Sequence, residues 1–241
     1  HILSRPIFSF SFVLFTIICL PVSVFALPTF TDVADEVGVG DNSRSLSVAF
    51  IDYDYDNSLD IFVANQFTTA ALYRNENDSF ANVIEENGLK NPQIGMGTWI
   101  GISGVFGDYN NDGYLDIYSV IDCNPNDPDA VLPCFNVLYQ NNGDNSFTDV
   151  TDIAEVHGDT AAGTSAIWTD YNNDGYLDLY VVNLGIENIL YKNNGNGTFT
   201  DVTDKAGGKA MCVGFDSAFF DYDNDGVLDF YVVNYTQSYF L

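Results

Sequence analysis

The sequence predicts an all-β protein in which four-stranded antiparallel sheets follow one another as the blades of a β-propeller. Three observations support this fold class. A nine-residue acidic motif occurs four times, beginning at Asp52, Asp108, Asp170 and Asp221, which are 56, 62 and 51 residues apart. Short apolar runs flank every copy, and turn-rich stretches connect two further recurring motifs. A period of this length indicates a repeat architecture.

The recurring motifs define four expected strands in each unit. The first strand is the apolar run before the acidic motif, at 48–51, 104–107, 165–169 and 217–220. The second follows the motif, at 59–64, 115–120, 177–182 and 228–233. The third carries a Leu-Tyr pair at 72–73, 138–139 and 190–191, and the fourth begins at Phe30, Phe80, Phe147 and Phe199. The units therefore span about 30–79, 80–146, 147–198 and 199–241.

The register of these strands indicates an incomplete ring. Residues 30–33 form an expected fourth strand that arrives before any first, second or third strand. In a closed propeller such a strand completes a blade that the other end of the chain begins. The sequence stops after the second expected strand of its fourth unit. We therefore expect a fragment with about three to four blades, because a propeller needs about four to eight.

The composition excludes some partners. Hydrophobic residues make up 46% of the 241 residues, enough for a substantial core. The formal net charge of −27 repels nucleic acid and anionic membranes, so we expect neither nucleic acid binding nor membrane insertion of the mature part. Asp outnumbers Glu by 28 to 6, and 14 of the Asp lie in the four motifs. A charge that served only solubility would not need these fixed positions.

The N-terminal segment is typical of a secretory signal. Arg5 precedes an apolar run, and Val24 and Ala26 place compact residues at positions −3 and −1 of a cleavage site after Ala26. We expect a signal peptide over residues 1–26 and a secreted mature chain over residues 27–241, with the cell surface or the periplasm as further destinations. An uncleaved membrane anchor over residues 6–26 is the alternative, because this stretch approaches spanning length.

The cysteines agree with export. Cys123 and Cys134 bracket a Pro-rich insertion and are expected to form a local disulfide in an oxidising compartment. A zinc site is the alternative, but no His or further Cys lies nearby in the sequence. Cys212 is left over, and we expect a buried free thiol.

The acidic motif places oxygen ligands at alternate positions. Positions 1, 3, 5 and 9 carry Asp or Asn, and the variable position 7 suits a backbone carbonyl ligand. The expected metal ligands are Asp52, Asp54, Asp56, Ser58 and Asp60; Asp108, Asn110, Asp112, Tyr114 and Asp116; Asp170, Asn172, Asp174, Tyr176 and Asp178; and Asp221, Asp223, Asp225, Val227 and Asp229. Hard oxygen donors in this number suit Ca²⁺, which takes about 6–8 oxygens, whereas Mg²⁺ keeps more water and soft metals prefer Cys or His. We expect up to four structural Ca²⁺ sites.

The motif has two other possible interpretations. An EF-hand needs a Glu at position 12 and flanking helices, but position 12 is Val63, Ser119, Val181 or Val232 and the flanks are expected strands. The Asp and Asn could instead form hydrogen-bonded turns without a metal. We favour a metal, because so many carboxylates close together would repel one another. Position 6 is Gly in three copies and Asn57 in the first, as a sharp turn with positive φ requires.

The residues of the third repeat carry a resemblance to a known family. Asp170–Asn183 reads DYNNDGYLDLYVVN and Ile189–Thr203 reads ILYKNNGNGTFTDVT, which resembles the FG-GAP-like or VCBS repeats, relatives of the calcium-binding blades of integrin α-subunit propellers. The resemblance covers about residues 29–241. The Phe-Thr-Asp-Val-Thr form is also similar to secreted cartilage acidic proteins and their relatives with an ASPIC/UnbV domain. The resemblance implies a calcium-binding propeller used for extracellular binding or adhesion.

Three functions follow as hypotheses. The first is a secreted, calcium-stabilised module that binds an extracellular protein or glycan. The second is the propeller of a secreted enzyme, such as a polysaccharide lyase or quinoprotein, but His157 is the only His after the signal segment and no common catalytic motif occurs. We therefore expect no enzyme. The third is a structural repeat of a larger surface protein. The stretch around Trp99 and the insertion at 122–134 are the expected partner surface.

Overall fold

A computed structural model describes residues 29–40, 43–66, 68–89, 99–123, 135–158, 162–207, 211–234 and 239–240. The chain divides into two units, His1–Asp32 and Val33–Leu241, and the repeats lie in the second. The expected signal peptide and its cleavage point lie outside the described residues. Within the described ranges, no helix has the length and apolar character needed to cross a membrane.

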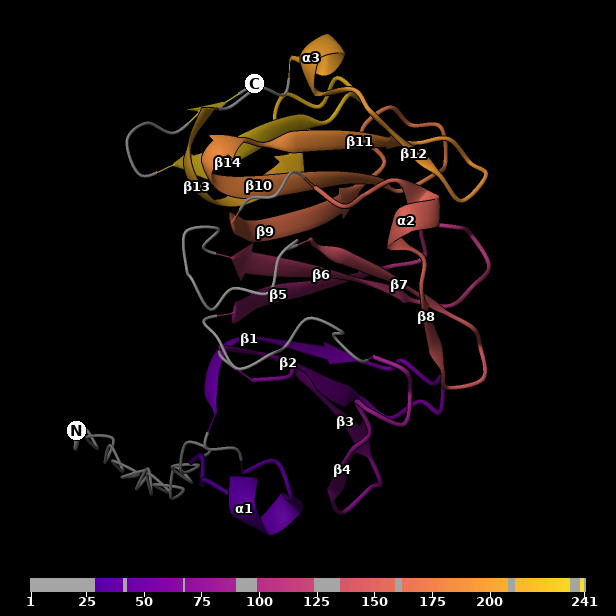
Figure 1. The fold of residues 1–241 in the computed structure, drawn as a ribbon, viewed down its shortest axis with the longest axis vertical. Helices are drawn as coiled ribbons and strands as arrows, with labels where there is room; N and C mark the ends of the chain where they lie inside the picture. The colour runs from indigo at the N-terminus through magenta and orange to yellow at the C-terminus, as the bar shows by residue number, and fades with distance from the viewer. Residues whose placement is uncertain are drawn as a thin grey trace, which may run out of the picture. The chain divides into compact units, whose positions relative to one another are not determined.

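The second unit is built from antiparallel sheets of four strands, as the sequence predicts (Figure 1). The first blade contains β1 (Arg44–Ile51), β2 (Asp60–Gln66), β3 (Ala71–Asn75) and β4 (Phe80–Asn82). The second contains β5 (Trp99–Gly107), β6 (Asp116–Cys123), β7 (Val137–Asn141) and β8 (Phe147–Asp149). The third contains β9 (Ala162–Thr169), β10 (Asp178–Glu187), β11 (Ile189–Asn193) and β12 (Phe199–Asp201). The fourth has three described strands, β13 (Met211–Phe220), β14 (Asp229–Asn234) and β15 (Tyr239–Phe240).

Neighbouring blades are in direct contact along their first two strands. The first strands β1, β5, β9 and β13 follow one another side by side. One backbone-paired residue pair also joins β2 to β5, and two such pairs join β10 to β13. An inner blade therefore buries one face against the blade before it and the other against the blade after it.

Every first strand has a β-bulge at the same place. The pairing with the second strand shifts between Ser45 and Ser47, Gly101 and Ser103, Gly163 and Ser165, and Gly214 and Asp216. In each blade the extra residue lies six positions before the first Asp of the acidic motif. A bulge adds local twist and re-aims the strand. Its repetition shows that the path into the acidic loop is the same in all four blades.

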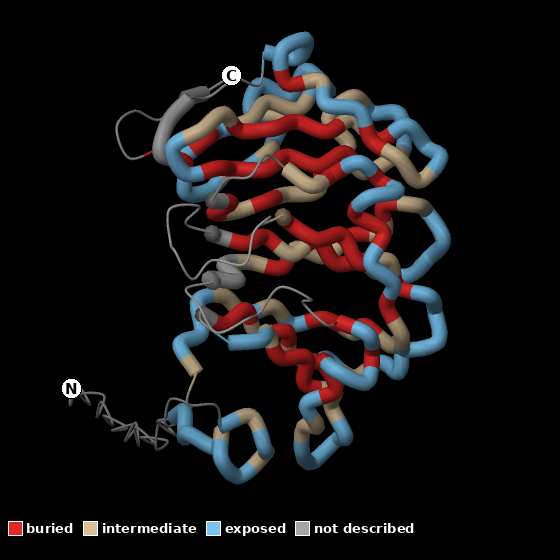
Figure 2. Tube along the Cα trace, viewed as in Figure 1, coloured by how far each residue is buried: buried red, intermediate tan, exposed pale blue. Residues whose placement is uncertain are grey.

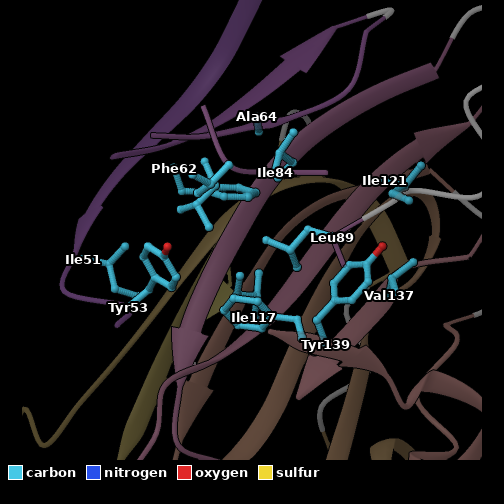
Figure 3. Packing of buried hydrophobic residues seen from close by; sticks show 13 residues of the cluster. Ile51, Tyr53, Phe62, Ala64, Ile84, Leu89, Ile117, Ile121, Val137 and Tyr139 are labelled. Atoms are coloured by element: carbon cyan, nitrogen blue, oxygen red, sulfur yellow. The ribbon is translucent and has the colours of Figure 1, made fainter. Parts of the chain in front are cut away.

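The hydrophobic core lies between the blades rather than within one sheet. Figure 2 shows buried residues running along the strands of the second and third blades. The cluster between the first and second blades includes Ile51, Phe62, Ile117 and Tyr139 (Figure 3). Phe62 packs edge-on against Phe106, with ring centroids 5.5 Å apart. A Cβ at Gly104 would lie 2.4 Å from the Phe62 ring, so this close approach requires glycine.

A second cluster joins the second and third blades. It contains the fully buried Tyr118 and Leu179, and the Tyr118 hydroxyl donates a hydrogen bond of 3.0 Å to the Val156 carbonyl. The Tyr109 ring stacks on Trp168, with centroids 6.2 Å apart. The second strands of these two blades, β6 and β10, are therefore buried on both faces, as expected for strands between two layers, whereas Tyr231 and Val233 of β14 are exposed.

The predicted strand at residues 30–33 is wrong, since these residues belong to no strand. A strand needs a partner for its backbone groups, and none of the described strands pairs with this segment. The helix α1 (Ala34–Val37) follows instead, as α2 (Thr151–Ala154) and α3 (Thr203–Ala206) follow β8 and β12. The fourth blade also differs from expectation, because β15 adds a third strand to β14.

Candidate metal-binding loops

The four acidic loops occupy the same place in the fold, between the first and second strands of each blade. Two positions of each loop have the left-handed backbone conformation. Position 6 has it at Asn57 (φ 69°), Gly113 (φ 92°), Gly175 (φ 87°) and Gly226 (φ 86°), as predicted. Position 4 has it too, at Tyr55 (φ 60°), Asn111 (φ 58°), Asn173 (φ 56°) and Asn224 (φ 60°). The turn at position 4 was not predicted, although Asn in three copies is a signal for this conformation.

The carboxylate at position 1 organises the turn. In the second loop, Asp108 Oδ1 accepts the backbone N–H of Asp112 at 3.0 Å and its Oδ2 accepts that of Gly113 at 2.9 Å. Asp170 and Asp221 accept the corresponding pairs at 2.9–3.0 Å. Carboxylates that accept two backbone N–H bonds are held in a fixed orientation. The loop is therefore ordered by its own side chains.

The first loop differs at this position. Asp52 Oδ2 accepts the N–H of Asn57 at 3.1 Å, but Asp52 Oδ1 is buried and has no hydrogen-bond partner among the described residues. In the third loop, Asn172 Oδ1 is likewise buried and unpaired within the described part of the chain. Buried oxygens without a partner are rare and call for a specific explanation, such as a bound ion or water.

In the first three loops the carboxylate at position 9 is the buried end of the loop, whereas Asp229 of the fourth loop is half-buried. Asp60, Asp116 and Asp178 are fully buried. Asp116 Oδ2 accepts the N–H of Tyr109 at 3.2 Å, and its Oδ1 accepts the N–H of Asn141 at 2.8 Å. The first and third loops repeat this pattern, with Tyr53 and Asn75, and with Tyr171 and Asn193. The position 9 carboxylate therefore fastens the loop to the third strand of its own blade.

Burial also changes the acidity of these carboxyls. Removal from water raises the pKa of Asp116 to about 7, although its two backbone hydrogen bonds oppose the rise. The same cause raises the pKa of Asp60 and of Asp178 to about 6. The other carboxylates of each loop raise these pKa values further. Burial disfavours the charged form of a carboxylate in this way.

In the second and third blades, an Asn of the third strand links the acidic loop to the loop of the preceding blade. Asn193 Nδ2 donates to the Leu177 carbonyl of its own loop at 3.0 Å and to the Tyr109 carbonyl of the second loop at 2.8 Å. Asn141 does the same with Leu115 at 3.3 Å and Tyr53 at 3.0 Å. This Asn appeared in the sequence only as part of the Leu-Tyr motif, because its partners lie far away along the chain.

Position 4 provides a second link between blades. Asn111 Nδ2 donates to the Gly175 carbonyl at 3.1 Å, and Asn173 Nδ2 donates to the Gly226 carbonyl at 3.2 Å. In the first blade, Tyr55 contacts Tyr114 edge-on, with centroids 5.5 Å apart. The loops therefore form a connected row along one end of the blades.

The open end of each loop holds the remaining predicted ligands. One carboxylate oxygen each of Asp52, Asp54 and Asp56 lies within 4.8 Å of the others, and so do those of Asp221, Asp223 and Asp225. The second and third loops carry Asn110 and Asn172 at position 3, so their row is two carboxylates and an amide. Position 5 also accepts the N–H of position 7, for example at 2.9 Å between Asp112 and Tyr114. The donor set is oxygen throughout, which suits a hard cation.

Some predicted features fall outside the described residues. Cys134 and most of the 122–134 insertion are among these, so the predicted Cys123–Cys134 disulfide and the partner surface stay predictions. His157, in contrast, is described. Its ring contacts the Asp152 carboxylate and the Phe135 ring, whose centroid is 4.9 Å away.

The repeated blade with its acidic first loop defines a class of repeat protein. The model of the FG-GAP-like repeat matches residues 52–119, 123–181 and 170–232, which together cover most of the chain. The chain belongs to the FG-GAP-like repeat family. No curated protein was found to match the chain significantly.

Proposed function

We propose that the protein is a calcium-stabilised propeller module that binds an extracellular protein or glycan. The observation that carries the calcium part is the pair of buried oxygens, Asp52 Oδ1 and Asn172 Oδ1, which find no partner among the described residues and lie inside loops made of oxygen donors. A cation next to these atoms would supply the partner that the protein does not.

The charges of the loops support the same proposal. The four motifs hold 14 carboxyl groups, and the buried ones at position 9 have raised pKa values because burial disfavours their charged form. Positions 1, 3, 5 and 9 would hold the ion together with a position 7 carbonyl. When bound, Ca²⁺ would neutralise the loop and tie the first and second strands of a blade together. About 2.7 kcal/mol of stability would follow per site at a hundredfold excess over Kd.

Calorimetric titration of the chain with Ca²⁺, with Mg²⁺ as the control, tests this proposal. We expect up to four Ca²⁺ ions to bind, the melting temperature to rise in millimolar Ca²⁺, and EDTA to reverse the rise. Identical melting curves in Ca²⁺ and EDTA would refute the calcium role.

Binding rather than catalysis is the proposed activity. The strongest catalytic candidate among the described residues is the pair of His157 and Asp152, but the Asp152 side chain is 91% exposed and the other described contact of the His157 ring is Phe135. Family membership and the signal-like N-terminus support a module that works outside the cell.

The binding role has its own experiment. The immobilised protein is probed with a panel of extracellular matrix proteins and glycans in Ca²⁺ and in EDTA, with serum albumin as the negative control. We expect at least one ligand to bind in Ca²⁺ above the albumin level, and to be lost when residues 124–133 are replaced by a short Gly-Ser linker. Binding no stronger than that of albumin across the panel would contradict the proposal.

A further inference from the structure

The second and third acidic loops have the same sequence but different surroundings. Residues 108–116 and 170–178 both read DYNNDGYLD. Each loop is held by the same backbone bonds to its first and ninth carboxylates. Any difference in their affinity for a cation must therefore come from residues outside the loop.

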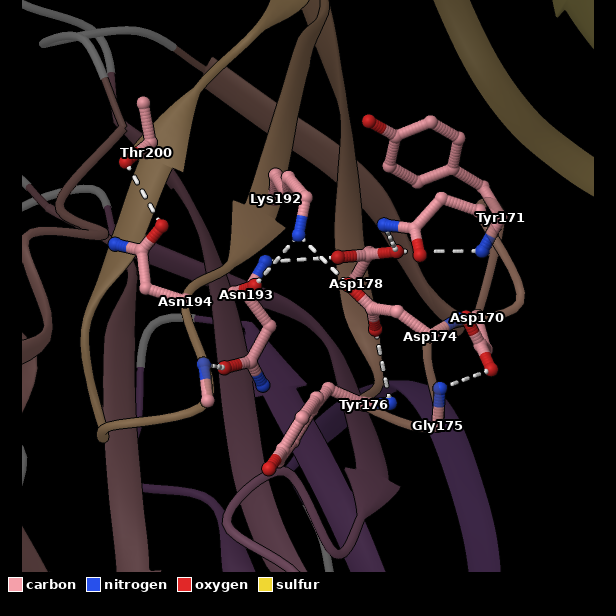
Figure 4. Close-up of polar contacts among 12 residues, drawn as sticks. Asp170, Tyr171, Asp174, Gly175, Tyr176, Asp178, Lys192, Asn193, Asn194 and Thr200 are labelled. Carbon is pink, nitrogen blue, oxygen red and sulfur yellow. Dashed lines mark hydrogen bonds and ion pairs between the residues drawn. The ribbon is translucent and has the colours of Figure 1, made fainter.

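One such residue differs in charge between the two blades. The third strand carries Gln140 in β7 and Lys192 in β11 at equivalent positions, each directly before the Asn that fastens the loop. Lys192 Nζ lies 2.7 Å from Asp174 Oδ2, the position 5 carboxylate of the third loop, and 3.2 Å from the Asn193 carbonyl (Figure 4). In the second loop, the corresponding oxygen, Asp112 Oδ2, accepts instead the neutral Asn110 Nδ2 at 2.8 Å.

We propose that Lys192 is a built-in counter-ion that lowers the affinity of the third loop for a divalent cation below that of the second loop. This inference rests on the calcium function proposed above. A cation that approaches the third loop must displace the ammonium group from Asp174 and is repelled by it. The second loop offers its carboxylates without that competition.

The electrostatics of the third loop agree with this role. The hydrogen bond from Lys192 lowers the pKa of Asp174, and the pKa of Lys192 is raised by the same bond and by the charges of Asp174 and Asp178. The ammonium group therefore acts on both the open and the buried carboxylates of the loop. Lys192 therefore balances part of the negative charge of the third loop by itself.

The first blade has a basic residue, Arg74, at the same strand position, but its ion pairs lie outside the acidic loop. Arg74 forms ion pairs with Glu76 at 2.9 Å and with Glu86 at 3.7 Å. These two glutamates neutralise the guanidinium group outside the loop. The third strands of the first three blades are described at this position. Of the side chains there, Lys192 is the one that is ion-paired to a carboxylate of an acidic loop.

The experiment follows each loop separately in the full chain. The Gly113 and Gly175 N–H groups donate to Asp108 and Asp170 at 2.9 Å, so their NMR signals report on their own loops during a Ca²⁺ titration. We expect the Gly113 signal to reach its midpoint at a Ca²⁺ concentration about three- to tenfold below that of Gly175, as one added like charge a few ångströms away predicts. Lys192→Gln should remove this difference by moving the Gly175 midpoint alone.

The reciprocal variant and a matched control complete the test. Gln140→Lys should raise the Gly113 midpoint by a similar factor and leave Gly175 unchanged. Lys205→Gln removes one positive charge from α3, which lies beside the opposite end of β11, and should move neither midpoint. In EDTA, Lys192→Gln should lower the melting temperature more than Lys205→Gln, because it leaves the loop carboxylates unbalanced.

The outcomes separate this inference from the calcium function. If both signals respond to Ca²⁺ but Lys192→Gln leaves the Gly175 midpoint where it was, the role of Lys192 is refuted and the calcium function stands. If neither signal responds to Ca²⁺ in any variant, both are refuted. A Gly175 midpoint already equal to that of Gly113 in the unmodified protein also overturns the proposal.

Discussion

Each of the first three acidic loops has a buried end and an open end, and the Asp side chains have different roles at the two ends. At the buried end, the carboxylates of Asp60, Asp116 and Asp178 are inaccessible and accept backbone N–H groups from two directions. At the open end, Asp112 and Asp174 are exposed; Asp112 accepts bonds from its own loop, and Asp174 accepts bonds from its own loop and from Lys192. A repeated Asp can therefore tie the loop to the backbone of its blade at position 9 and present an exposed carboxylate at position 5.

The largest effect is expected at the buried end. Asp116→Ala leaves the N–H groups of Tyr109 and Asn141 without acceptors, and each unsatisfied buried group costs about 1–3 kcal/mol. We expect a loss of about 3 kcal/mol in the free energy of unfolding, measured by urea denaturation in EDTA. Asp116→Asn, which keeps one acceptor oxygen, should lose less. A loss below about 1 kcal/mol in the Ala variant would contradict the structural role.

The next effect concerns the Asn that links neighbouring blades. Asn193→Ala removes the donor to the Tyr109 and Leu177 carbonyls and the acceptor for the Gly195 N–H. We expect a loss of about 2–3 kcal/mol in the same urea experiment. Asn194 is the control, since it is exposed and bonds within its own turn, and its replacement by Ala should cost less than about 1 kcal/mol. Equal losses in the two variants would show that the bridge adds no stability.

A smaller effect is expected from the backbone of the turn. Gly175 has φ of +87°, and a Cβ at this position would meet no atom within 4 Å, so Gly175→Ala meets only the conformational cost of the left-handed region. About 1 kcal/mol of stability should be lost. The reverse change, Asn57→Gly, tests the same point in the first loop and should cost nothing or add about a few tenths of a kcal/mol. A clear loss of stability in Asn57→Gly would mean that the Asn57 side chain has a role of its own.

The smallest effect on stability is expected at the open end. Asp112→Asn keeps an acceptor for the Tyr114 N–H, so the free energy of unfolding in EDTA should change by less than about 0.5 kcal/mol. The Ca²⁺ midpoint reported by Gly113 should nevertheless rise strongly, with that of Gly175 unchanged. Loss of stability without a change in Ca²⁺ response would reverse the roles assigned to the two ends of the loop.

Much of the fold could be predicted from the sequence because the same motifs recur in every repeat. Four copies of one motif located the first and second strands, and the Leu-Tyr and Phe motifs located the third and fourth. The strand predicted at residues 30–33 failed because a motif alone provides no partner strand. The bulges were not predicted, since the residues at those positions, such as Leu46 and Thr164, share no chemical type.

The sequence by itself determined which atoms can meet within a loop, because neighbours along the chain fix the odd-numbered oxygens and the glycine turn. Only the tertiary structure decided which oxygens are buried and which stay open. Asn193 and Tyr109 meet across 84 residues, and Asn141 and Tyr53 across 88, through the packing of one blade on the next. The difference between Gln140 and Lys192 likewise affects the acidic loops only because the third strand lies beside its loop in the folded blade. Two identical stretches of sequence differ in electrostatic environment because the charged residues around each loop come from other parts of the chain, and only folding brings them close.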